Sequence, residues 1–318
     1  MSHFDTKPLH VRVADINELQ HQLTRLDAPQ LGSMRVFRGQ SKRHSAGGVP
    51  DSLKAALHRA ARSRYDEQWL TAARTALFGK KASDDRSGEY LNVWLPALLQ
   101  HYGPGSYFLD VTNDLDVALW FALHKYEHRK KQMRLLFGGE TAHIEIELAW
   151  YESISGSKDG AFDPVIYVID VFRWPGFESP AHADLVAISE LPAGQRVLNR
   201  ATRLEKQAAY LLYASPEAIS GPDLVWAPRA AISFSPQFVL GDRASAWQIS
   251  DLFPPPRLDP CYASLMTFPL AIQNPGHYGH PLNIPCFISS DEAKRTAGNR
   301  VVSADSEIHD FVSRLTAI

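Results

Sequence analysis

The amino-acid sequence predicts an α+β protein, because strand-like and helix-like segments follow one another along its 318 residues without strict alternation. The run Val165-Ile166-Tyr167-Val168-Ile169 is continuously apolar, as in a central strand. Val13 to Leu26, in contrast, carries Ile16, Leu19 and Leu23 on one side of a helix. No internal repeat or low-complexity tract competes with this prediction.

The same patterns place each element along the chain. Helices are predicted where apolar residues recur every three or four positions: Val13 to Leu26, Ser52 to Phe78, Tyr90 to His101, Asp114 to His128, and Glu307 to Leu315. Strands are predicted at short apolar or alternating runs: Met34 to Gly39, Tyr107 to Val111, Ala142 to Trp150, Pro164 to Phe172, Leu204 to Ala214, and Ile284 to Ser289. We expect Phe253 to Pro281, which is rich in proline and aromatic residues, to be an irregular covering segment, and the basic run His128 to Lys131 to be a solvated helix end.

Composition narrows the class of protein. Hydrophobic residues make up 45% of the chain and charged residues 21%, and the formal net charge is −2, so there is no electrostatic footprint of general nucleic-acid binding. No stretch approaches the roughly 20 apolar residues of a membrane span, and the first residues lack the apolar segment of a signal peptide. Cys261 and Cys286 have no metal-ligand spacing. We therefore expect a cytoplasmic protein without a membrane partner or a metal site.

Two strand ends carry the residues of greatest chemical interest. The first strand ends in Phe37-Arg38-Gly39-Gln40-Ser41, and its glycine would let a ligand approach the backbone. The second, Leu109-Asp110-Val111-Thr112, ends in a carboxylate and a hydroxyl and leads into a helix-like segment. Small polar groups at neighbouring strand ends predict a small-molecule cleft.

These motifs resemble the FRG domain, which is named after its Phe-Arg-Gly signature. The resemblance spans Arg35 to Tyr213 and rests on several motifs in the family's order. They are Phe37-Arg38-Gly39-Gln40-Ser41, Pro50-Asp51-Ser52-Leu53, Gln100-His101-Tyr102-Gly103, Leu109-Asp110-Val111-Thr112, Ala118-Leu119-Trp120-Phe121-Ala122 and Arg203-Leu204-Glu205-Lys206-Gln207. The resemblance implies an N-terminal helical lead-in over 1–33, an FRG core over 34–215, and a C-terminal extension over 216–318 that packs on the core.

The motif order is also similar to that of ADP-ribosyltransferases of the Arg-Ser-Glu type. That similarity implies a mixed split sheet with flanking helices, and NAD as the substrate. In this alignment Arg38 matches the family's Arg, Asp110 to Thr112 falls at its Ser-Thr-Ser, and Glu205 to Gln207 falls at its Glu-x-Glu. Gln207 is a departure, because an amide carries no negative charge to stabilise an oxocarbenium-like sugar.

The resemblance assigns a role to each residue. Arg38 would hold a phosphate or a ribose, with Gly39 and Gln40 beside it. Asp110 and Thr112 would orient the nicotinamide ribose, and Glu205 or Gln207 would face the reacting carbon. His101 and Tyr102 would line the wall.

Structural interpretations remain open for each of these residues. Arg38 could be a salt-bridge partner, Asp110 and Thr112 could cap the following helix, and His101 and Tyr102 could pack beneath the site. A second carboxylate pair, Glu145 and Glu147, alternates with apolar residues and is explained as the solvent face of a strand.

The sequence thus predicts an NAD-consuming ADP-ribosyltransferase that acts on a macromolecule, plausibly a toxin or phage-defence effector restrained by an antitoxin or another regulatory partner. The alternative is a non-catalytic sensor that binds a nucleotide or a protein through a degenerate transferase cleft. The missing carboxylate at Gln207 distinguishes the two, because only the sensor tolerates its loss without a substitute. A nuclease is disfavoured, because no carboxylate or histidine cluster has metal or acid–base spacing.

Overall fold

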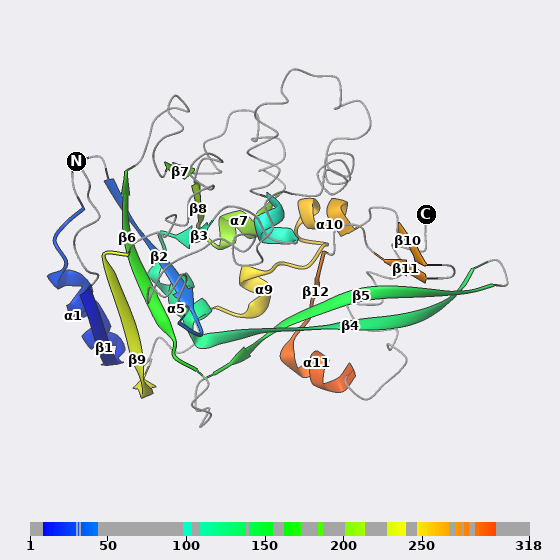
Figure 1. The fold of residues 1–318 in the computed structure, drawn as a ribbon, viewed down its shortest axis with the longest axis horizontal. Coiled ribbons are helices and arrows are strands. Elements are labelled where there is room, and N and C mark those ends of the chain that lie inside the picture. The colour runs from blue at the N-terminus through cyan, green and yellow to red at the C-terminus, as the bar shows by residue number, and fades with distance from the viewer. Residues whose placement is uncertain are drawn as a thin grey trace, which may run out of the picture.

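The computed structural model describes residues 9–29, 31, 33–43, 98–103, 109–137, 140–154, 162–172, 184–186, 201–213, 228–239, 247–266, 271–274, 277–279 and 284–296. The predicted helices Ser52 to Phe78 and Glu307 to Leu315 lie outside these residues, as does most of Tyr90 to His101. Within them, the mixture of sheets and helices confirms the α+β class (Figure 1). No helix among the described residues is long and apolar enough to cross a membrane.

Seven strands form one mixed sheet in the order β1-β9-β6-β2-β3-β8-β7. Their bounds are β1 (Leu9–Asp15), β2 (Ser33–Gln40), β3 (Leu109–Thr112), β6 (Val165–Phe172), β7 (Asp184–Val186), β8 (Ala209–Tyr213) and β9 (Ala230–Val239). β1 runs parallel to β9, and the other neighbours are antiparallel. The predicted strands at β2 and β6 are confirmed, and they lie side by side in the middle of this sheet.

A second sheet is built around a long hairpin. β4 (His124–Phe137) and β5 (Glu140–Ser153) are antiparallel partners along their whole length. β11 (His277–Gly279) and β12 (Cys286–Phe287) each pair in parallel with β5, and β10 (Ala271–Asn274) pairs with β11. Figure 1 shows the hairpin extending away from the seven-stranded sheet.

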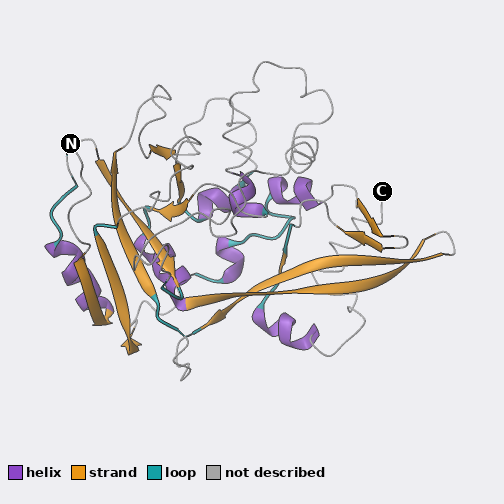
Figure 2. Cartoon of the chain, in the orientation of Figure 1, coloured by secondary structure: helices purple, strands orange, loops and turns teal. Residues whose placement is uncertain are grey.

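Helix α5 (Leu115–Leu123) contributes side chains to two separate hydrophobic clusters. α1 (Ile16–Arg25) and α5 cover one face of the large sheet, where their side chains pack with those of β6 and β9. A neighbouring cluster joins α5 to α9 (Ile249–Leu252) through Val117, Trp120 and Leu252. The structure also describes α7 (Thr202–Lys206), α10 (Pro260–Met266) and α11 (Ser290–Thr296). In Figure 2, α7 and α9 lie between the large sheet and the hairpin.

The first helix begins later than its apolar pattern predicts. Asp15 caps it, accepting hydrogen bonds from the Asn17 and Glu18 N–H groups at 2.9 Å each. The residues before the cap continue β1, which pairs with β9 from the far end of the chain. β1 was not predicted from the sequence, because a strand partner more than 200 residues away leaves no local signal.

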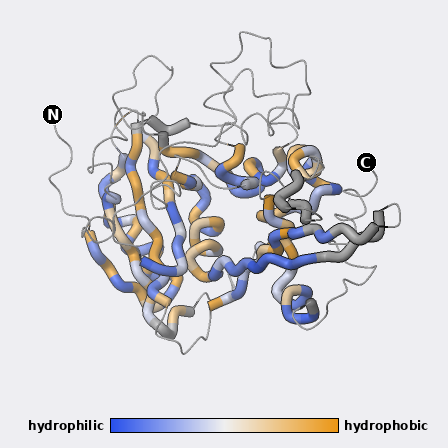
Figure 3. Tube along the Cα trace, turned by 45° about the vertical axis from the view of Figure 1, so that its right-hand side comes forward, coloured by the Kyte–Doolittle hydropathy of each residue, from blue (hydrophilic) through white to orange (hydrophobic). Residues whose placement is uncertain are grey.

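The basic run His128 to Lys131 is a correction. α5 ends at Leu123, and the run lies in β4, not at a helix end. Pairing with β5 places this run in a strand. Lys130 Nζ lies 2.6 Å from Glu145 Oε1 across the two strands, and His128 Nδ1 lies 3.4 Å from Glu147 Oε1. Glu145 thus serves as a cross-strand ion-pair partner, in line with the solvent-face interpretation of the two glutamates. β4 shows as a largely hydrophilic tube in Figure 3.

Two further segments differ from their predictions. The segment Leu204 to Ala214 was predicted to be a strand throughout, but α7 occupies its first residues and β8 begins only at Ala209. Ala208, with a φ of 43°, makes the turn between them. The segment Phe253 to Pro281 contains α10, β10 and β11, so it is more regular than its proline and aromatic content suggests.

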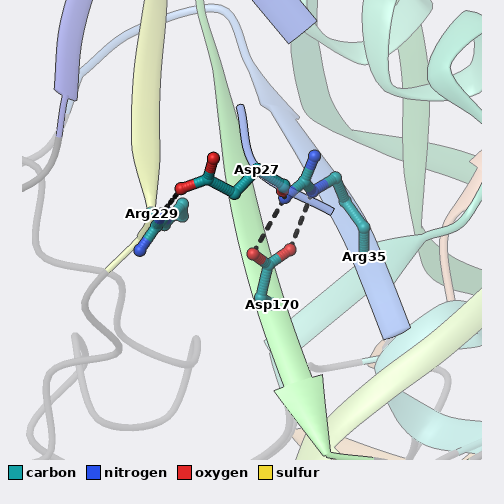
Figure 4. A network of polar contacts seen from close by, with 4 residues as sticks. All are labelled: Asp27, Arg35, Asp170 and Arg229. Atoms are coloured by element: carbon teal, nitrogen blue, oxygen red, sulfur yellow. Dashed lines mark hydrogen bonds and ion pairs between the residues drawn. The ribbon is translucent and has the colours of Figure 1, made fainter. Parts of the chain in front are cut away.

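A partly buried ion pair joins the two central strands, and it allows a stability prediction. Arg35 Nε and Nη2 donate to the Asp170 carboxylate at 2.7 and 2.9 Å, and the Asp27 carbonyl accepts a third bond (Figure 4). We expect Arg35→Ala to lower the free energy of unfolding by about 1–2 kcal/mol, because charge-assisted bidentate bonds are lost. Arg229→Ala, which breaks an exposed pair with Asp27, should change it by less than about 0.5 kcal/mol in the same urea titration. Equal losses of unfolding free energy in the two variants would contradict the larger contribution of the Arg35–Asp170 pair.

Candidate functional site

The ends of β2 and β3 bring Arg38 and Asp110 together. Phe37 on β2 is in register with Thr112 on β3, so the two strands are neighbours at this point. Arg38 Nη1 donates a hydrogen bond of 2.6 Å to the Asp110 backbone carbonyl. Arg38 and Asp110 therefore belong to one site, although they are 72 positions apart in sequence.

The Asp110 side chain is held by two residues from the segment 98–103. Gln100 Nε2 donates to Asp110 Oδ2 at 2.6 Å, and His101 Nε2 lies 3.4 Å from Asp110 Oδ1. The His101 side chain is 4% exposed, whereas that of Asp110 is 34% exposed. The Asp110 carboxylate thus lies next to a buried histidine and is itself partly accessible to solvent.

Gln207 completes the arrangement from the C-cap of α7. Its Oε1 lies 3.1 Å from His101 Nδ1, and its Nε2 donates to the Leu252 carbonyl at 2.9 Å. We call Arg38, Gln100, His101, Asp110 and Gln207 the polar cluster. The structure connects these residues in one continuous set of contacts that begins at β2 and reaches α9.

Electrostatics favour the neutral form of the buried histidine. Burial lowers the pKa of His101, and the nearby Arg203 charge lowers it further, whereas Asp110 and the bond to Gln207 raise it. Burial has the largest effect, so the net shift is downward. An isolated imidazolium is therefore disfavoured at this position.

Several of the sequence-predicted residues lie outside the polar cluster's contacts. Thr112 is buried, and its Oγ1 accepts from the Asp114 N–H at 3.0 Å. Asp114, rather than Asp110, caps α5. Glu205 is exposed on α7 instead of beginning a strand. Tyr102 is fully buried and donates to Asp259 Oδ2 at 2.7 Å, which places it beneath the site as the packing interpretation predicts.

Gly39 serves helix packing in this structure. A Cβ atom built on Gly39 would lie 1.7 Å from the Ala118 carbonyl oxygen and 2.8 Å from the Ala122 nitrogen. The space that the missing side chain leaves is therefore filled by the backbone of α5 rather than open to a ligand. Gly39 is required because α5 lies directly against β2.

Sequence reasoning assigned no role to Arg203, although this residue organises the layer beneath the polar cluster. Arg203 is fully buried, and its Nη1 donates to the His101 carbonyl at 2.6 Å. Four aromatic rings surround its guanidinium, with Cζ-to-centroid distances of 4.5 Å for Tyr102, 4.6 Å for Tyr262, 4.8 Å for Phe287 and 5.1 Å for Phe253. The only signal in the sequence was its place in the Arg203 to Gln207 motif.

Replacing the Arg203 cation should destabilise the whole protein. We expect Arg203→Met to lower the free energy of unfolding by about 2 kcal/mol or more, because the cation–π contacts vanish and the His101 carbonyl loses its donor. Arg203→Lys keeps a positive charge among the rings and should recover part of the loss. Chemical denaturation of the three proteins measures the effect. If Arg203→Met were as stable as the wild type, the contacts between Arg203 and the four aromatic rings would contribute no net stability.

Comparisons with known proteins agree with the motifs. The family model of the FRG domain matches residues 33–131, about a third of the chain, and confirms the resemblance seen in the sequence. The match contains Arg38, Gln100, His101 and Asp110, whereas Gln207 lies beyond it. No curated protein and no solved structure matches the chain significantly.

Proposed function

We propose that this chain is an ADP-ribosyltransferase that transfers ADP-ribose from NAD to a macromolecule, on a fold of the ADP-ribosyltransferase type. The observation that carries the proposal is the meeting of Arg38 and Asp110 at neighbouring strand ends. A guanidinium suits the phosphates of NAD, and a carboxylate suits the positive charge that develops on the ribose.

Asp110 takes the charge-stabilising role that the sequence could not assign. Gln207 is neutral, and both ends of its amide are engaged by His101 and Leu252. Glu205 is exposed on α7 and makes no side-chain contact with the polar cluster among the described residues. Asp110 is the one carboxylate of the described polar cluster, and it is partly open to solvent.

A buried acceptor in the polar cluster suits a donor group of NAD. Gln100 Oε1 is buried and has no hydrogen-bond partner among the described residues. An unmatched acceptor calls for a donor. Ribose hydroxyls and the nicotinamide carboxamide are donors of this kind, so this oxygen supports a nucleotide ligand.

The proposed reaction breaks the bond between nicotinamide and C1 of its ribose, and nicotinamide leaves with the bonding electrons. Asp110 stabilises the resulting sugar cation, and a nucleophilic oxygen or nitrogen of the macromolecule forms the new bond to C1 and loses a proton to solvent. Such a reaction consumes NAD and modifies cell components, as a toxin or phage-defence effector in the cytoplasm would. An antitoxin or another regulatory partner would have to restrain it.

Incubating the full chain with NAD labelled in the adenylate half, with and without cell extract, tests this function. Transferase activity predicts free nicotinamide together with label on a macromolecule. The alternative is a non-catalytic module that binds a nucleotide or a protein, which the neutral and fully engaged Gln207 favours. NAD binding without nicotinamide release would establish that alternative in place of the transferase.

A further inference from the structure

The orientation of the Gln207 amide is fixed by its contact with α9. Gln207 Nε2 lies 2.9 Å from the Leu252 carbonyl oxygen and donates to it. Turning the amide over would place its own oxygen against that carbonyl, and two acceptors would then face each other in a buried position. Gln207 Oε1 is therefore the atom that faces His101.

This orientation sets the tautomer of His101. Gln207 Oε1 can only accept, and it lies 3.1 Å from His101 Nδ1, so Nδ1 must carry a hydrogen. A neutral imidazole has a hydrogen on one nitrogen only. His101 Nε2 is consequently a bare acceptor whenever the ring is neutral.

That bare nitrogen faces a carboxylate oxygen. His101 Nε2 lies 3.4 Å from Asp110 Oδ1, and neither atom has a hydrogen-bond partner among the described residues. The carboxylate is held in this position because Gln100 Nε2 donates to its other oxygen at 2.6 Å. Two acceptors fixed this close together in a buried environment repel each other unless a proton lies between them.

We infer that His101 Nε2 and Asp110 Oδ1 share one proton, and that Gln207 is the positioning residue that directs Nε2 toward Asp110. Burial lowers the pKa of His101, while the Asp110 charge raises it. The role of a Gln at this position is then to select a tautomer rather than to supply charge. The titratable and charged side chains that act on the imidazole are Asp110 from β3 and Arg203 from α7.

The proton's use in the transfer reaction rests on the proposed function. Loss of the shared proton changes the net charge of the pair from zero to −1. The deprotonated pair is the form that best stabilises a positively charged sugar beside Asp110. The location of the proton, in contrast, depends only on the hydrogen bonds described above and needs no substrate.

Nitrogen-15 NMR of the full chain with labelled histidine tests the proton's location. The chain has 13 histidines, and the signals absent from His101→Gln identify His101. Nδ1 should remain protonated across the titration, while Nε2 changes from protonated to bare as the pH rises. A neutral His101 with the hydrogen on Nε2 and a bare Nδ1 would overturn the inference.

Two further variants test the shared proton and the role of Gln207 in a second way. In Asp110→Asn, the new amide can donate to Nε2, so the titration midpoint of His101 should fall by about one pH unit or more. In Gln207→Met, the selection of the Nδ1–H tautomer should weaken, and both neutral tautomers should appear. Unchanged His101 signals in these two variants would refute the shared proton and the role of Gln207. The measurement uses no NAD, so a failure of the proposed function leaves its result unaffected.

Discussion

Gly39→Ala is expected to lower the free energy of unfolding by about 3 kcal/mol or more, or to prevent folding altogether. The added methyl group would lie 1.7 Å from the Ala118 carbonyl oxygen. Overpacking a core costs about 1–3 kcal/mol where side chains can adjust. Here the obstacle is helix backbone, so either α5 must move away from β2 or the strand end must bend.

Gly103→Ala is a matched control for this prediction. A Cβ atom there would meet the Ile284 Cδ1 at 3.1 Å and the Leu99 Cδ2 at 3.5 Å, both at the ends of flexible side chains. We expect a loss of less than about 1 kcal/mol. Urea denaturation followed by circular dichroism compares the two variants with the wild type. A Gly39→Ala midpoint equal to that of Gly103→Ala would contradict the close packing of α5 on β2.

Arg38→Ala is expected to reduce NAD-dependent activity by about 10- to 100-fold while the protein remains folded. A hydrogen bond to a charged group contributes about 1.5–3 kcal/mol, and 1.4 kcal/mol corresponds to a factor of ten. The fold loses the bond from Arg38 to the Asp110 carbonyl, a charge-assisted bond worth about 1.5–3 kcal/mol. Nicotinamide release and the melting temperature, measured on the same preparation, separate the two effects.

Arg35→Ala supplies the control for a change of charge on the same strand. Arg35 bonds to Asp170 and to the Asp27 carbonyl, neither of which belongs to the polar cluster. Its loss should lower stability and leave NAD turnover within about twofold of the wild type. An Arg38→Ala protein with normal melting and full activity would remove Arg38 from the mechanism.

The fold could be predicted from sequence where the signal is local. The apolar run at β6 and the short strand at β2 both have such a local signal, and both strands were predicted at the right place. The first half of β4 was predicted to be helical, because His128 to Lys131 suits a helix end as well as a strand. Only the pairing with β5 selects the strand. β1 depends in the same way on β9.

The candidate site was predictable only in part, for a similar reason. Arg38, Asp110 and His101 were identified from short motifs, and the structure places them in contact. The carbonyl of Leu252, which orients Gln207, could not be identified, because a backbone acceptor has no side-chain signature. The role of Gly39 was also hidden, since a glycine motif does not tell a ligand from a helix as the neighbour.

Calorimetric titration of NAD into the full wild-type chain tests the central claim most directly. We expect saturable binding of NAD, and an affinity about tenfold or more weaker in Arg38→Ala, because in the proposed complex the guanidinium contacts the phosphates. Arg35→Ala should bind as the wild type does. The absence of any binding heat with millimolar NAD, from a wild-type protein shown to be folded, would contradict the proposed site.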